Sequence, residues 1–252
     1  MNNELFLNNE VYRKKSSMKF TFYFLTIFIV FFIGGFYYFF DRLFPYSQII
    51  GQILVLTVAT NLLGQFYLKK EKYQRIYKDE AYVKAFYRFH VTAMPLIYVS
   101  ALHPIFAYST GEIINCWYIN FVFGGYLILS AILLHRRTIK IFGVDNLFMY
   151  YVYYPEKGGK TDSIIHSMLR HPIYSAMMRL ALGLGLLRGT LESFCVGLII
   201  PFLQFFWLYV YEEPDLITRF GKEYKKYRHN VWALLVKPKE LLLFWGFLFG
   251  KK

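Results

Sequence analysis

Two short polar stretches stand at the two ends of an apolar segment in the second half of the chain. The first reads RHPIY, from Arg170 to Tyr174, and the second reads EEPDL, from Glu212 to Leu216. Ionisable groups beside long apolar segments are costly unless they are paired or used. The glutamates could therefore mark the end of a helix, with lysine and arginine as partners, or bind a charged ligand. Arg170 and His171 have the same two interpretations.

The elements that must position these residues are long apolar blocks. The chain has 252 residues, of which 56% are hydrophobic, 21% aromatic and 18% charged, whereas about 25% charged residues are usual in globular domains. Residues 20–40 hold no charged side chain over 21 positions, which is enough for a helix to cross about 30 Å of hydrocarbon. Five further apolar blocks follow, at residues 46–68, 89–108, 113–135, 173–187 and 190–211.

This pattern predicts an all-α, polytopic integral membrane protein with about six transmembrane helices. The block 173–187 is short for a crossing, so five spans are the alternative. We interpret residues 173–211 as a tight helical hairpin, which would bring RHPIY and Glu-Glu together at one membrane face. An N-terminal bundle of four spans, residues 1–135, then precedes a second region, residues 136–252, which holds the cofactor-binding region predicted below.

Lysine and arginine predict how the chain is oriented in the membrane. If the N-terminus is cytosolic, the inside segments are 1–19, 69–88, 136–172 and 212–252, and they carry 26 of the 29 lysines and arginines. The positive-inside rule then places both termini in the cytosol. The net charge of +13 reflects this topology and suits an anionic lipid surface, so we expect no nucleic-acid partner. Without organelle-retrieval signals, a bacterial inner membrane fits slightly better than other membranes.

Three segments outside the apolar blocks have helical or interfacial patterns. Residues 69–88 form either an amphipathic helix on the membrane surface or a solvated connector. A cytosolic amphipathic helix, with Pro214 in its first turn, is predicted near residue 220. Its apolar stripe recurs at spacings of four, three and four: Phe220, Tyr224, Tyr227 and Val231. Residues 240–250 are too short to span and are predicted to form an interfacial or re-entrant anchor.

The chain lacks the residue patterns that several common kinds of site require. The six histidines form no HxxxH or HxxHH set and the two cysteines no CxxC, so we expect no metal site. The stretch GLGLLRG, residues 183–189, lacks the preceding strand of a phosphate-binding loop, and close helix packing explains its glycines better. No GxSxG or Cys–His arrangement is present.

Taken in order, the polar motifs resemble those of the membrane methyltransferases related to isoprenylcysteine carboxyl methyltransferase and phospholipid N-methyltransferase. The signature of that family is an RHPxY-type motif, a helical hairpin, Glu-Glu and an FGxxYxxY helix. This chain reads RHPIY, a hairpin, EEPDL and FGKEYKKY within residues 140–238. The two motifs in this order are much more specific than either motif alone.

The resemblance implies a methyltransferase that uses S-adenosylmethionine, bound at the cytosolic membrane face without a Rossmann domain. It also implies a substrate that is a lipid or another membrane-partitioned small molecule. Four residues would line the cofactor site: His171, Tyr174, Glu212 and Glu213. Arg170 and Pro172 would complete the cofactor-binding set by shaping the start of the hairpin. Carboxylates and aromatic faces suit a sulfonium cofactor.

The chain departs from the family pattern in ways that bear on substrate and catalysis. Family members often carry Gly-x-Tyr before RHP, where this chain has Ile164 and His166; His166 could replace the tyrosine, act as a base or be a surface histidine. Ala176 stands where glycine is common. The arginine that prenylcysteine methyltransferases place before Glu-Glu is missing, which counts against a prenylcysteine carboxylate. Arg179, the other weak catalytic candidate, could meet an anionic lipid group or pair with Glu192 or a carbonyl.

Two other functions are compatible with parts of the pattern. An NADPH-dependent membrane reductase of the sterol-reductase type has a similar RHP-like motif but tends to lack the Glu-Glu pair. A non-catalytic lipid-binding membrane protein could retain the fold, although the paired halves common in transporters are missing. The catalytic group of a methyltransferase is not assigned by the sequence.

Overall fold

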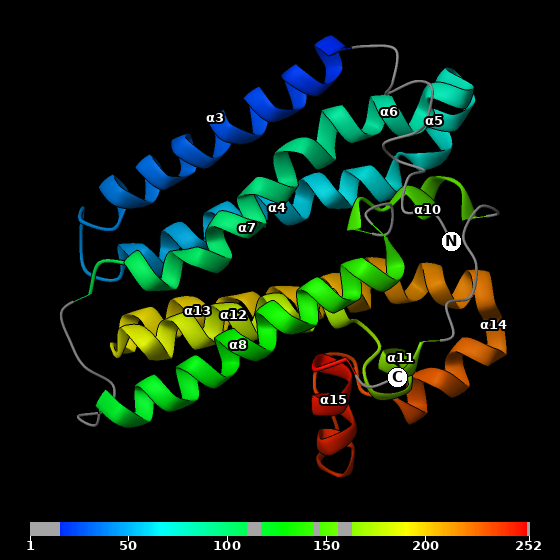
Figure 1. Ribbon diagram of the computed structural model, residues 1–252. Helices are drawn as coiled ribbons and strands as arrows, with labels where there is room; N and C mark the ends of the chain where they lie inside the picture. Colours follow the sequence, from blue (N-terminus) through cyan, green and yellow to red (C-terminus); the bar gives the residue numbers. More distant parts are fainter. Residues whose placement is uncertain (1–15, 110–116, 144–146, 156–162, 251–252) are drawn as a thin grey trace. The chain divides into compact units, whose positions relative to one another are not determined.

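The structure is a computed structural model that describes residues 16–109, 117–143, 147–155 and 163–250. These residues form helices and connecting turns and contain no strand, which confirms the all-α prediction (Figure 1). The chain divides into two compact units. Unit 1 comprises residues 1–100 and 142–160, and unit 2 comprises residues 101–141 and 161–252. The functional division at residue 135 stays a prediction.

Five helical segments of the described residues are long and apolar enough to cross a membrane. They are Phe20–Phe40, Ser47–Leu68, Lys70–Phe106, Trp117–Phe142 and Leu191–Asn230. The helix from the short sixth block, α12 (Pro172–Arg188), has 17 residues and is about 26 Å long at 1.5 Å per residue. The polytopic membrane prediction is therefore confirmed, with a count that matches the five-span alternative.

A buried polar network joins three helices of unit 1. These helices are α3 (Ser16–Phe40), α4 (Ser47–Leu68) and α7 (Val91–Phe106). The hydroxyl of Tyr37 lies 2.8 Å from both Gln52 Oε1 and Ser100 Oγ, and Gln52 Nε2 donates to the carbonyl of Ser100 at 2.9 Å. Hydrogen bonds between polar side chains hold apolar helices together, because separating the helices would leave those polar groups without partners in hydrocarbon.

The Tyr37 network gives a stability prediction for unit 1. Tyr37→Phe removes the hydroxyl but keeps the ring, so it leaves Gln52 and Ser100 without that partner. We expect a loss of about 1–2 kcal/mol in the free energy of unfolding, measured by reversible unfolding in mixed micelles. Tyr38→Phe is the matched control because the Tyr38 side chain is exposed; it should change the stability by less than about 0.5 kcal/mol. Equal effects of the two changes would contradict the role assigned to the network.

The basic segment 69–88 is helical, which favours the helix over a solvated connector. It contains α5 (Lys70–Tyr77), a 3-10 turn at Lys78–Glu80 and α6 (Ala81–Ala85), followed by a π-helical turn at Phe86–His90. Three of its aromatic side chains, Tyr73, Tyr82 and Phe86, are buried in one cluster with residues of α4 and α10 (Tyr150–Tyr153). For example, the ring of Tyr82 meets that of Phe66 edge to face, the ring of Tyr153 packs against Phe66 at a tilt, and Tyr153 donates to the Phe66 carbonyl at 3.0 Å.

Unit 2 is built around the predicted helical hairpin. Helix α12 is followed by Gly189, whose φ of 77° favours glycine. Helix α13 (Leu191–Trp207) begins after Thr190, whose hydroxyl accepts from the Ser193 N–H at 3.3 Å. Figure 1 shows α8 (Trp117–Phe142) running alongside this hairpin. The remaining helices of the unit are α11 (Ile164–Met168), α14 (Glu213–Asn230) and α15 (Leu241–Leu248).

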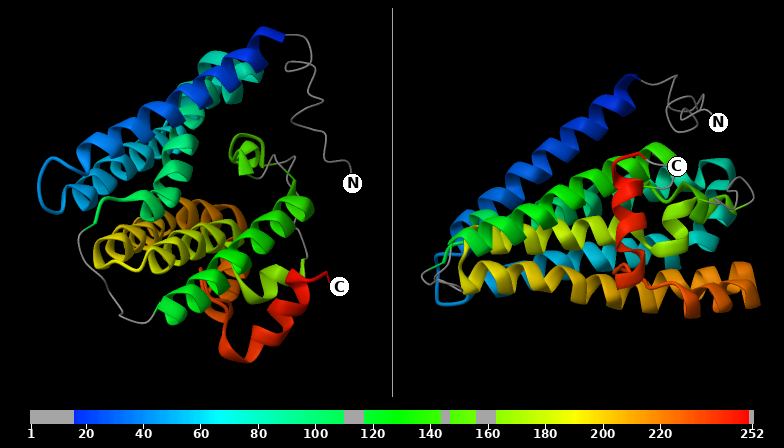
Figure 2. Two further views of the ribbon diagram at one scale, coloured as in Figure 1. Left: turned by 60° about the vertical axis from the view of Figure 1, so that its left-hand side comes forward. Right: turned by 60° about the horizontal axis from the view of Figure 1, so that its bottom comes forward.

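At glycines, the two helices of the hairpin approach each other, and α12 approaches α8, backbone to backbone. A Cβ atom added to Gly183 would lie 2.9 Å from the Gly124 carbonyl oxygen, and one added to Gly197 would lie 2.8 Å from that of Ala181. The packing interpretation of the GLGLLRG stretch is thereby confirmed, because only glycine fits so close an approach. Helix α15 runs across the direction of these helices (Figure 2), in the segment predicted as a short terminal anchor.

Candidate functional site

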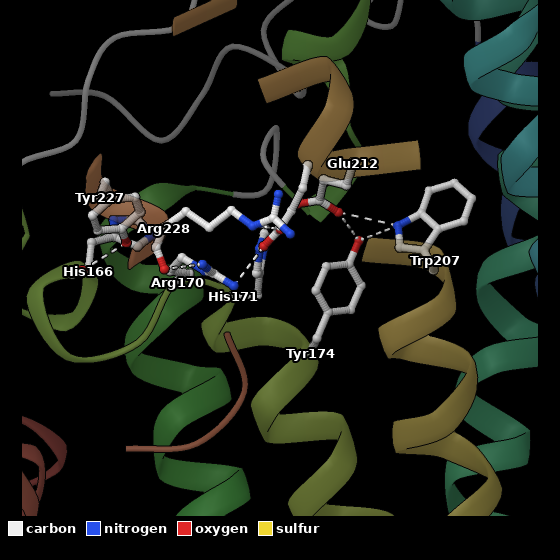
Figure 3. Close-up of polar contacts among 9 residues, drawn as sticks. His166, Arg170, His171, Tyr174, Trp207, Glu212, Tyr227 and Arg228 are labelled. Atoms are coloured by element: carbon white, nitrogen blue, oxygen red, sulfur yellow. Dashed lines mark hydrogen bonds and ion pairs between the residues drawn. The ribbon is translucent and has the colours of Figure 1, made fainter. Parts of the chain in front are cut away.

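Five charged side chains meet at the end of the hairpin where α12 begins and α13 continues into α14. We call them the charged cluster: Arg170, His171, Glu212, Glu213 and Arg228 (Figure 3). All of them belong to unit 2. The predicted meeting of RHPIY with Glu-Glu is confirmed by the ion pairs of His171 with both glutamates.

Glu213 is the buried centre of this cluster. Its side chain is 1% exposed. Arg170 Nη2 lies 2.8 Å from its Oε1, and His171 Nε2 lies 3.4 Å from the same oxygen. The other oxygen, Oε2, lies 2.9 Å from Arg228 Nε. Since a buried charge is tolerated only when it is compensated, these three contacts are what allow Glu213 to be buried.

Glu212 faces the opposite, more open side of the cluster. Its Oε2 accepts hydrogen bonds from the hydroxyl of Tyr174 at 2.6 Å and the indole N–H of Trp207 at 3.2 Å. His171 Nδ1 lies 3.2 Å from its Oε1, and 19% of the Glu212 side chain is exposed. Figure 3 shows Tyr174, Trp207 and Glu212 on one side of His171, and Arg170 and Arg228 on the other. Glu212 is therefore a carboxylate held in a fixed place beside aromatic rings.

A π-helical turn explains how two consecutive glutamates both contact one histidine. The turn covers Leu208–Glu212, directly after α13. Two residues later, Pro214 lacks the N–H that would bond to the carbonyl of Val210, so the ordinary helical ladder is interrupted there. A π-helical turn widens the helix and is often found at functional sites.

A kink in α14 brings Arg228 back to Glu213. Gly221 has φ 57° and ψ −131° inside this helix, a conformation that glycine alone adopts readily. In a straight helix the fifteen steps from Glu213 to Arg228 would span about 22 Å, which is too far for an ion pair. In Figure 1, α14 bends so that its second half returns towards α11.

Backbone hydrogen bonds fix RHPIY in place. The N–H groups of Arg170 and His171 donate to the carbonyls of Trp232 and Ala233 at 2.9 and 3.0 Å, and Arg170 Nη1 donates to the Arg228 carbonyl at 2.6 Å. Pro172 follows as the first residue of α12, where its missing N–H has no helical partner to lose.

The structure links His166 to this region through its main chain. In α11, the carbonyl of His166 accepts the hydroxyl of Tyr227 at 2.8 Å. Its side chain is half-buried. Arg179, the second catalytic candidate, lies further along α12; its guanidinium contacts the hydroxyls of Ser175 and Ser130 at 3.2 and 3.4 Å. The roles of both residues stay predictions.

Two residues of the site were not singled out by the sequence. Arg228 was one of several basic residues between the aromatic positions of an amphipathic helix, and Trp207 was part of an apolar block. Gly221 within a helical pattern could have indicated a kink, but no sequence signal indicates that Trp207 turns its indole N–H towards Glu212.

Within the described part of the chain, no group of three or more His, Cys, Asp and Glu side chains is arranged to hold a metal ion.

The electrostatics of the cluster favour a protonated His171. Burial alone lowers the pKa of the imidazole, but hydrogen bonds and Coulomb attraction to Glu212 and Glu213 outweigh burial and raise the pKa above its ordinary value. A histidine whose pKa is raised by folding stabilises the folded protein fully below its unfolded pKa of about 6.5. That contribution is lost as the pH rises through the higher folded pKa.

The raised pKa of His171 predicts how stability depends on pH. Between pH 6 and pH 9, the stability difference between the wild type and His171→Gln should shrink as His171 loses its proton. The measurement is reversible unfolding in mixed micelles at several pH values. His229→Gln is the matched control, because His229 is exposed on α14 and outside the cluster, so its difference from the wild type should stay small throughout. A difference for His171→Gln that grows with pH would contradict the assignment.

The apolar helices define an integral membrane protein, and the charged cluster forms a polar site where α12 begins and α13 continues into α14. Residues 119–223 match the family model described as phospholipid methyltransferase. That range contains α8's apolar stretch, RHPIY, the hairpin and both glutamates, so this part of the chain is a phospholipid methyltransferase family domain, as the motifs indicated. No curated protein and no solved structure shows a significant match to the chain.

Proposed function

We propose that the protein is an S-adenosylmethionine-dependent methyltransferase that acts on a lipid or another membrane-partitioned small molecule. The observation that carries this proposal is Glu212, a partly exposed carboxylate fixed by Tyr174 and Trp207. The family match over residues 119–223 supports the reaction class. Methyl transfer needs alignment of the reactants and exclusion of water more than an elaborate acid–base apparatus.

The Glu212 carboxylate and the aromatic rings beside it suit a cationic cofactor. S-adenosylmethionine carries a sulfonium and an ammonium group, and when bound it supplies an electrophilic methyl group. Glu212 would bind one of these cations, and the rings of Tyr174 and Trp207 would add cation–π attraction. His171 would keep the Glu212 carboxylate oriented from the other side. Arg170, Pro172 and Glu213 would act on the same site by fixing where α12 and α14 begin.

The residues of the site indicate the chemical identity of the methyl acceptor less closely than that of the cofactor. A carboxylate acceptor needs no base, whereas an amine must first lose its proton. We assign no catalytic base; His166 is the weak candidate from the sequence. A lipid acceptor would reach the site from the bilayer and the cofactor from the cytosol, so a site at the membrane boundary lets the two meet.

We also propose that both termini and the charged cluster lie on the cytosolic side, in a bacterial inner membrane. The concentration of lysine and arginine in four segments supports this orientation. Five long spans would leave the termini on opposite sides, so the proposal requires α12 to cross as a sixth, shorter helix. Its antiparallel packing against α13 supports such a crossing.

Isothermal titration with S-adenosylmethionine and S-adenosylhomocysteine tests the cofactor proposal. The detergent-purified wild type should bind both, and Glu212→Gln should bind S-adenosylmethionine at least about tenfold more weakly, because a hydrogen bond to a charged group contributes about 1.5–3 kcal/mol. Glu223→Gln removes an exposed carboxylate from α14, the helix that follows Glu212, and should bind like the wild type. A folded wild type that binds neither compound would reject the proposal; thermal stabilisation by NADPH instead would favour a reductase.

A further inference from the structure

Arg179 is a buried cation that the proposed cofactor site does not use. It is 6% exposed and lies in the middle of α12. Among the described residues, no carboxylate forms an ion pair with it, and the pairing with Glu192 that the sequence allowed is not among its contacts. Its polar neighbours are uncharged hydroxyls: Ser175, Ser130 and the phenol of Tyr126. A buried charge without a counter-charge is costly, and within membrane helices it marks a functional site more often than a structural one.

The place of Arg179 relative to the charged cluster follows from the helix period. His171, Ser175 and Arg179 are spaced by four residues, so they share one side of α12. Because Arg179 Nε donates to Ser175 Oγ at 3.2 Å, the side chain turns back towards the start of the helix. The guanidinium therefore lies about one helical turn, roughly 5 Å, deeper along α12 than His171.

Helix α15 covers the guanidinium with an apolar side chain. The Phe244 ring is fully buried, and its centroid lies 4.9 Å from Arg179 Cζ. Next to it, Trp245 packs against Tyr126 of α8 at 5.4 Å. On the other side of α15, Leu242 is 89% exposed, which suits contact with acyl chains. Arg179 thus lies between three helices, near a surface that suits lipid and away from bulk water.

We propose that Arg179, together with Ser130 and Ser175, binds the phosphate group of the lipid acceptor. The guanidinium fork matches phosphate geometry, and the two hydroxyls can also donate to a phosphate oxygen. This inference rests on the proposed methyltransferase function and adds a specificity-determining residue to it. A lipid whose reacting end meets the charged cluster would place its phosphate deeper, on the side of its acyl chains, which is where Arg179 lies.

Lipid-dependent thermal stability, measured in neutral detergent with S-adenosylhomocysteine present, tests this inference. The three probes are phosphatidic acid, diacylglycerol with the same acyl chains, and inorganic phosphate. Phosphatidic acid should raise the midpoint of unfolding of the wild type by mass action, and the other two should not. Arg179→Gln should abolish the response while leaving S-adenosylhomocysteine affinity unchanged. Arg188→Gln, an exposed arginine on the same helix, should respond like the wild type.

Stability without lipid separates a binding role from a structural one. If Arg179 binds an anion, Arg179→Gln without lipid should be at least as stable as the wild type, because it removes a buried charge that no described carboxylate compensates. Arg179→Lys keeps the charge but loses the fork, and it should bind phosphatidic acid at least about tenfold more weakly than the wild type. This variant tests the inference even where Arg179→Gln expresses poorly.

Each other result overturns the inference. A response to phosphatidic acid in Arg179→Gln or Arg179→Lys equal to that of the wild type would show that Arg179 does not bind the phosphate. A loss of stability in lipid-free Arg179→Gln would show a structural role. A full response to inorganic phosphate would show a site for free anions and not for lipid. A wild type that fails to bind S-adenosylhomocysteine would instead reject the proposed function, whatever the lipid result.

Discussion

Glu213→Gln is expected to lower the free energy of unfolding by about 3–5 kcal/mol, the range typical for breaking a buried ion pair by removing one partner. The glutamine would leave Arg170 and His171 without the carboxylate that both contact at Oε1. Both of their side chains are only 5% exposed, so water cannot replace the lost charge. Arg228, at 36% exposure, can be solvated and should contribute less to the loss.

The neighbouring Glu212→Gln is the matched comparison for this prediction. It changes the same chemical group one position earlier, but its side chain is 19% exposed, and an amide oxygen can still accept from Tyr174 and Trp207. We expect a loss of about 1–2 kcal/mol for the weakened contact with His171. Reversible unfolding of both variants in mixed micelles measures the difference. Equal losses, or a larger loss for Glu212→Gln, would contradict the division into a buried structural carboxylate and an open ligand-facing one.

This division changes which glutamate is informative about the cofactor. The sequence treats the pair as equivalent, because both follow the same apolar block and both match the family motif. A binding defect in Glu213→Gln would be ambiguous, since the whole cluster is expected to be weakened. Glu212→Gln changes the proposed contact with less damage to the fold, so it provides the sharper test.

The parts of the fold that the sequence predicted well are those set by local composition. The apolar blocks at 46–68 and 173–187 correspond to α4 and α12 within one residue at each end, because long uncharged runs leave the backbone no alternative to a helix in lipid. The meeting of RHPIY with Glu-Glu was predictable for a related reason: a hairpin with a short turn must bring its two ends together.

The parts that the sequence did not predict depend on local departures from the α-helix. Trp207 and Glu212 are five residues apart, a spacing that does not share a face in an α-helix but does across a π-helical turn. Arg228 reaches Glu213 only because Gly221 redirects the helix. Both contacts join residues whose periodicity would place them apart, so a pattern of 3.6 residues per turn cannot reveal them.

Gly124→Leu is expected to cost about 3 kcal/mol in the free energy of unfolding, at the upper end of typical overpacking effects. A Cβ added at Gly124 would lie 2.8 Å from the Gly183 carbonyl oxygen and 3.0 Å from the Leu187 amide nitrogen. Both are backbone atoms, so only a shift of α8 away from α12 can relieve the contact. Such a shift would also separate Ser130 on α8 from Arg179 on α12. In the structure, Arg179 Nη1 lies 3.4 Å from Ser130 Oγ.

The adjacent glycine is a strict control for this change. A Cβ added at Gly125 would meet no atom within 4 Å, so Gly125→Leu should leave stability unchanged or raise it slightly, because leucine favours helix more than glycine does. Reversible unfolding of both variants in mixed micelles measures the contrast. A similar loss in both would show that the glycine pair acts through helix flexibility, whereas a loss confined to Gly124→Leu would establish that close backbone contact holds α8 against the hairpin that carries the site.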